Sequence, residues 1–154
     1  LDYCFLTENA ETATALDPHG QAEVPPAGPS QTVLVMQESL CRSVWAYAVE
    51  HKGSSEAWVI DQIAEDLDTV GLRNDRIIVK SDQETSANDI AREIAKCRAS
   101  EYGTALDNSH VGDSNTNGTI ERAIQDVEGQ VRTLRSALEH RLSAPVRLSS
   151  PIVP

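Results

Sequence analysis

The chain has 154 residues, the size of one ordinary domain, and it is long enough to bury a hydrophobic core. Its 13 basic and 24 acidic residues give a net charge of −11, which excludes a generally basic surface for nucleic acid. No apolar stretch approaches the roughly 20 residues that cross a bilayer, and no secretory signal opens the chain. We expect a soluble domain. Because it opens on Leu1 and its only methionine is Met36, we also expect a piece of a longer polyprotein.

Residues 1–7 alternate enough to predict a short strand. The segment 8–31 then holds four of the seven prolines and few large apolar residues, which is typical of a disordered insertion. Two strands follow, at 32–37 and 42–50, because both are rich in valine and aromatic residues and a short turn joins them. The first three strands should therefore form a meander.

Residues 56–71 have apolar side chains at helical spacing, with Ser54 or Ser55 as a predicted N-cap and Gly71 as the stop. A fourth strand is expected at 75–80, where three consecutive apolar residues favour burial on both faces.

A second helix is predicted over 87–100, with a Ser86 and Asp89 cap and a buried stripe of Ile90, Ile94 and Cys97. Residues 101–118 are rich in Gly, Asn, Asp and Ser and predict a loop, with one short strand around 102–106. The last helix should span 119–142, because seven apolar residues recur there three or four positions apart. Residues 143–154 form a predicted tail. The order indicates an α/β domain over 1–142, with a five-stranded mixed sheet and helices on both faces.

Cysteine and histidine residues do not predict a zinc site. Cys4, Cys41 and Cys97 are scattered singly, without a CxxC pair or a suitable histidine spacing. We expect reduced, partly buried thiols in an intracellular protein. Of the histidines only His110 lies near the motif described next, and we interpret it as a loop residue.

Three acidic residues stand out by their positions. Asp2 lies in the first strand, Asp82 follows the fourth, and Glu121 lies in the first predicted turn of the last helix. The ends of these elements can converge at one edge of a mixed sheet, and clustered carboxylates are what hard divalent cations require. Taken singly, Glu121 also suits a helix N-terminus, Asp82 suits a turn, and Glu84 is a competing carboxylate.

The flanking sequence resembles the D,D-35-E integrase cores of retroviruses and long-terminal-repeat retrotransposons, which share the ribonuclease H-like fold. The most specific segment is SNTNGTIERA at 114–123, and Ser81-Asp82 with Glu84 resembles the family's acidic segment without its glycine. Residues 33–53 resemble the second and third strands, and Leu1-Asp2-Tyr3 resembles the first. The spacing between Asp82 and Glu121 is 38 residues, and the insertion lengthens the spacing between Asp2 and Asp82 to 79.

The resemblance implies a divalent-metal-dependent enzyme that processes DNA 3′ ends and transfers strands, using two Mg²⁺ or Mn²⁺ ions. It implies catalytic metal ligands at Asp2, Asp82 and Glu121, and DNA contacts at Asn117, Gly118 and Arg122. The implied partners are the element ends and target DNA, other polyprotein domains and further copies of the chain, in the nucleus or a virus-like particle and not at a membrane. Two alternatives stay open: a catalytically weak remnant that acts as a dimerisation or DNA scaffold, and a ribonuclease H-like nuclease without joining activity.

The last helix departs from the retroviral pattern. Gln125 and Glu128 stand where retroviral members commonly have lysines that contact DNA. Three arginines, Arg122, Arg132 and Arg135, could replace them, but solvated arginines paired with Glu128 and Glu139 are the expected explanation. The sequence therefore predicts intact metal ligands beside an altered DNA-holding surface.

Overall fold

The computed structural model describes residues 1–7, 30–81, 84–98, 103–108 and 114–147. It contains the predicted sequence of elements, with strands β1 (Asp2–Thr7), β2 (Ser30–Gln37), β3 (Val44–Val49), β4 (Ile77–Ser81) and β5 (Thr104–Asn108), and helices α1 (Ala57–Thr69), α2 (Thr85–Cys97) and α3 (Ser114–Leu142). The α/β class is confirmed. The body of the predicted insertion lies outside the described residues, but Ser30 and Gln31, which were assigned to it, belong to β2.

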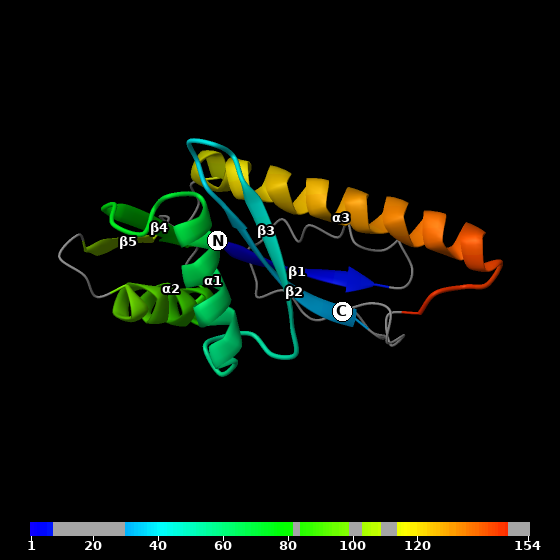
Figure 1. The fold of residues 1–154 in the computed structure, drawn as a ribbon, viewed down its shortest axis with the longest axis horizontal. Coiled ribbons are helices and arrows are strands. Elements are labelled where there is room, and N and C mark those ends of the chain that lie inside the picture. Colours follow the sequence, from blue (N-terminus) through cyan, green and yellow to red (C-terminus); the bar gives the residue numbers. More distant parts are fainter. Residues whose placement is uncertain (8–29, 82–83, 99–102, 109–113, 148–154) are drawn as a thin grey trace.

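The first three strands form an antiparallel sheet in the order β1-β2-β3, as predicted. Side chains on a strand alternate between the two faces, and this sheet buries both. One face carries Tyr3, Leu34 and Tyr47 into the larger core with α1 and α2, whereas the other carries Cys4 and Val35 against α3. Figure 1 shows α3 lying along the sheet on the side away from α1 and α2. Helices therefore cover both faces.

The predicted single sheet of five strands is present as two sheets, because β4 and β5 pair with each other in parallel and are separate from the first three strands. The prediction that β4 is buried on both faces is wrong. Ile77 and Val79 pack against the larger core, but Ile78 points the other way and is 68% exposed. A continuous apolar run does not by itself reveal whether a second layer covers the strand.

Both predicted serine caps are wrong, since Glu56 precedes α1, Glu84 precedes α2, and neither side chain caps its own helix. The predicted stop at Gly71 is confirmed. Its φ is +85°, and the Gly71 and Leu72 N–H groups donate to the carbonyls of Asp68 and Leu67, which is a Schellman ending. Glycine suits this position because a left-handed conformation strains residues that carry a Cβ atom.

Three further boundary or burial predictions need correction. The helix α3 begins at Ser114, five residues before the predicted start, so Glu121 is not in its first turn. Cys97 is exposed, and Ala87 and Ala91 complete the buried stripe of α2 instead. Cys41 is also exposed, so among the three free thiols only Cys4 is buried as the sequence led us to expect.

The substitution Glu56→Gln should flatten the acid side of the pH–stability profile. Burial raises the pKa of Glu56, but hydrogen bonds from the His51 N–H, the Trp58 indole and the Glu50 N–H outweigh it and hold the pKa below its ordinary value of 4.5. A carboxyl whose pKa is lowered by folding stabilises the protein above its unfolded pKa, and this contribution is lost as pH falls through the folded pKa.

Urea unfolding at several pH values between about 3 and 7 measures this effect. The wild-type free energy of unfolding should fall more steeply below pH 4.5 than that of Glu56→Gln. Glu65→Gln is the control, because Glu65 is an exposed residue of α1, the helix that follows Glu56. It should change the free energy of unfolding by less than about 0.5 kcal/mol. Equal slopes for wild type and Glu56→Gln would contradict the prediction.

Candidate functional site

Asp2 begins β1 and lies on the sheet face that α3 covers. Cys4 and Leu6, which follow it at two-residue intervals, belong to the core cluster against α3, so strand alternation places Asp2 on the same face. The side chain is half-buried, and its Oδ1 accepts a hydrogen bond from the Tyr3 N–H at 2.8 Å. The carboxylate is thus oriented by the backbone of its own strand.

The end of β4 lies beside the start of β1. The amino group of Leu1 donates to the carbonyl of Lys80 at 2.7 Å. This bond joins the residue before Asp2 to a residue of β4 that lies two positions before Asp82. Ser81 is 3% exposed, and its hydroxyl and the Asn88 side-chain oxygen are 3.1 Å apart, which ties the end of β4 to α2. Asp82 itself lies outside the described residues, so its carboxylate has no assigned position.

Glu121 lies on α3, one residue after Ile120, which packs against the cluster containing Cys4 and Val35. Its side chain and that of Arg122 are exposed, and Gly118 is exposed as well. The prediction that Asn117 and Gly118 lie in a loop is wrong, because both belong to α3, and the Asn117 side chain is outside the described part of the chain. Gly118 therefore leaves a position without a side chain on the surface of α3, and it does not act as a flexible loop residue.

Among the residues that the structure describes, no three acidic, histidine or cysteine side chains come together as a metal-binding group. Asp2 and Glu121 are included in that statement, whereas Asp82 is not. The structure therefore describes the positions of two of the three predicted metal ligands, Asp2 and Glu121.

Lys52, which was not predicted as a functional residue, lies over Tyr3 and Phe5, whose side chains are on the sheet face opposite to Asp2. The Lys52 ammonium lies 5.1 Å from the Tyr3 ring centre and 4.9 Å from that of Phe5, and it contacts Glu84 Oε1 and Oε2 at 2.9 and 3.0 Å. The Ser86 hydroxyl donates to the same carboxylate at 2.7 Å. Glu84, the competing carboxylate, is thus paired with Lys52, and we do not count it among the candidate metal ligands.

Tyr3 links this arrangement to the loop after β3. Its hydroxyl accepts a hydrogen bond from the Gly53 N–H at 2.8 Å. Burial raises the pKa of Tyr3, although the bond from Gly53 opposes the shift, and so the phenol stays neutral at physiological pH. No sequence motif identified Lys52, because its partners come from strands and loops far apart in the chain.

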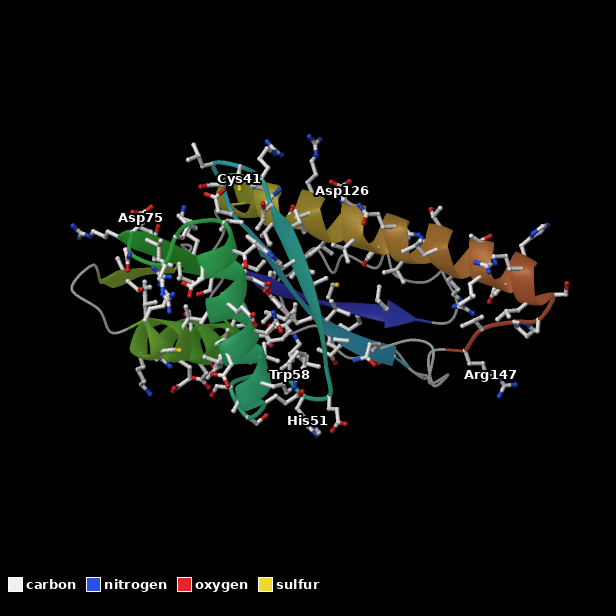
Figure 2. The ribbon with its side chains drawn as sticks, viewed as in Figure 1. Cys41, His51, Trp58, Asp75, Asp126 and Arg147 are labelled. Atoms are coloured by element: carbon white, nitrogen blue, oxygen red, sulfur yellow. The ribbon has the colours of Figure 1, made fainter. Side chains whose placement is uncertain are left out.

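Two arginines on the outer surface of α3 are held in ion pairs. Arg132 lies 3.8 Å from Glu128, and Arg135 lies 3.1 Å from Glu139, so the predicted pairing is confirmed. Figure 2 shows Asp126 on this helix as well, away from the sheet. Exposed pairs of this kind contribute little stability, but they neutralise the arginines that would otherwise attract phosphate.

Comparisons with known proteins add no identification to this geometry. No helix among the described residues is long and apolar enough to span a membrane. The chain matches no family model, no curated protein and no solved structure.

Proposed function

We propose that this chain is the catalytic core of a retrotransposon integrase, which uses Mg²⁺ or Mn²⁺ to process DNA 3′ ends and to transfer strands. The observation that carries the proposal is the 2.7 Å hydrogen bond between the Leu1 amino group and the Lys80 carbonyl. It joins two segments that are remote in sequence, one leading into Asp2 and the other leading into Asp82. This contact supports the proposal that Asp2 and Asp82 share one edge of the sheet.

This contact also supports a ribonuclease H-like strand order. The order β3-β2-β1-β4-β5 would follow if β1 lies beside β4 along its length, with the first three strands antiparallel and β4 and β5 parallel. The helix α3 supplies the third ligand. It packs over the face that carries Asp2, and Glu121 follows its packed residue Ile120.

The donor set fits hard divalent cations, because all three side chains offer carboxylate oxygens. When two such ions are bound, they supply activation of the attacking hydroxyl and stabilisation of the leaving oxygen. Asp2, Asp82 and Glu121 would hold the ions. The Tyr3 N–H orients Asp2, and Glu84 is paired with Lys52.

A second function is favoured by the charge of the helix surface. The net charge is −11. The positions at which retroviral integrases commonly have DNA-binding lysines are occupied by Gln125 and by Glu128, which pairs with Arg132. A remnant that scaffolds a larger assembly through protein contacts fits these facts. Catalytic activity decides between the two functions.

The decisive experiment assays the purified chain with Mn²⁺ on a branched DNA that mimics the joined product. Strand cleavage and rejoining are expected, and Asp82→Asn should abolish both. Asp89→Asn is the matched control, because Asp89 is an exposed partner of Arg92 on α2 and should leave the reaction unchanged. Absence of any reaction, with no effect of Asp82→Asn, would favour the scaffold, and hydrolysis without rejoining would identify a nuclease.

A further inference from the structure

The strand β3 forms one edge of its sheet, so the N–H and C=O groups of every second residue point away from β2. Its neighbour is β2, and the Glu38 N–H donates to the Ser43 carbonyl at 2.9 Å just before the strand. Hydrogen-bonded and non-hydrogen-bonded residue pairs alternate along an antiparallel ladder. In the observed register, Val44, Ala46 and Ala48 therefore direct their N–H and C=O groups away from β2.

The structure assigns no hydrogen-bond partner within the described residues to these outward groups. The next outward N–H belongs to Glu50 and is satisfied, since it donates to Glu56 Oε1 at 2.7 Å. Edge strands are ordinarily protected by a charge, a proline or a covering element. The β3 sequence, VWAYAV, contains neither a charge nor a proline, and Val44 and Ala46 are exposed.

We propose that a second copy of this chain occupies this edge, with the two β3 strands antiparallel and Ala46 on the twofold axis. Ala46 then faces Ala46 of the second copy, and Val44 faces Ala48. These are the residues whose backbone groups point outward, so each facing pair exchanges two N–H···O bonds. The two three-stranded sheets become one continuous sheet.

The charges that flank β3 favour this register. Arg42 and Glu50 are both exposed and lie just beyond the two ends of β3, so an antiparallel pairing brings Arg42 of one copy near Glu50 of the other. A parallel pairing would place like charges together. On the opposite face, Trp45 stands across from Tyr47 of the second copy in this register. Figure 2 shows the length of this edge, with Cys41 near one end of β3 and His51 near the other.

The hairpin before β3 is fixed, which keeps Arg42 near the strand end. The Glu38 carboxylate accepts hydrogen bonds from the Leu40 and Cys41 N–H groups. The bond from the Cys41 thiol, together with these backbone bonds, lowers the pKa of Glu38 and keeps the carboxylate charged. The proposal concerns association of the chain and stands apart from its chemistry on DNA.

The test uses opposite charges at the twofold axis. The wild-type chain should dimerise with increasing concentration in sedimentation velocity, and Ala46→Lys and Ala46→Glu should each raise the dimer dissociation constant about tenfold or more, because like charges then face each other. An equimolar mixture of the two variants should restore dimers. Because Ala46 is exposed, both variants should melt like the wild-type chain.

Two further measurements establish the register. Arg42→Glu and Glu50→Arg should each weaken the dimer, and the double variant should restore it. Amide exchange at Val44, Ala46 and Ala48 should slow as concentration rises, while that of Tyr47, already bonded to β2, stays unchanged.

Three results would overturn the proposal. The first is a monomer at every concentration with constant amide exchange at Val44, Ala46 and Ala48. The second is a dimer that none of the variants affects, since its interface must then lie elsewhere. The third is binding of an extended peptide at β3 without self-association, which would assign the edge to a different protein.

Discussion

The substitution Glu121→Gln should lower the rate of Mn²⁺-dependent strand joining by about 100-fold or more, if the chain is the proposed integrase core. Glutamine has nearly the same shape but lacks the negative charge that holds a divalent ion. Metal stabilisation of a phosphoryl transition state amounts to several kcal/mol, and each 1.36 kcal/mol corresponds to about a tenfold change in rate. The loss should appear in the chemical step rather than in the folded fraction, since the Glu121 side chain is exposed.

Glu128→Gln is the matched control, because it makes the same chemical change two turns further along α3. Glu128 pairs with Arg132 at 3.8 Å, and we expect its substitution to change the joining rate less than about twofold. Single-turnover assays at saturating Mn²⁺ and thermal melts of both variants provide the measurement. An unchanged rate for Glu121→Gln would remove this residue from the proposed triad.

The substitution Leu34→Ala should lower the free energy of unfolding by about 2 to 5 kcal/mol, because it removes a fully buried side chain and leaves a cavity. Leu34 is 0% exposed on β2, where the strands on both sides prevent the surrounding core from closing in. The loss combines the transfer of apolar atoms to water with the contacts that their neighbours forfeit.

Leu40→Ala supplies the comparison, since the same atoms are removed from a side chain that is 91% exposed at the turn before β3. Its effect should stay within about 0.5 kcal/mol. Urea titrations monitored by the far-ultraviolet circular dichroism of the chain give both values on one scale. A similar decrease in the free energy of unfolding for the two variants would mean that Leu34 does not lie in the buried core.

The sequence predicted the kinds and order of the elements because each has a local physical signature. Apolar residues at helical spacing marked α1 and α3, valine and aromatic residues marked β2 and β3, and the left-handed preference of Gly71 marked the end of α1. The candidate site was predicted only as positions in the chain. Its flanking residues suggested the chemistry, whereas nothing in the sequence identified Lys52 as the partner of Glu84.

Helix starts were predicted less well, because several polar residues near a helix can cap it and local sequence does not choose between them. Glu56 precedes α1 in place of the two serines, and its carboxylate holds the backbone that leads out of β3. That interaction depends on where β3 ends relative to α1, which is a tertiary property.

The sequence by itself determined the α/β class, the antiparallel meander and the positions of the candidate carboxylates, since hydrophobic period, turn residues and residue chemistry are local. Only the tertiary structure decided which faces are covered and which distant segments meet. It exposed Ile78 within an apolar run, joined Leu1 to Lys80, and left the outer edge of β3 without a neighbouring strand among the described residues. The physical reason is that burial and strand pairing are satisfied between elements, so an identical local pattern is compatible with a covered or an open neighbour.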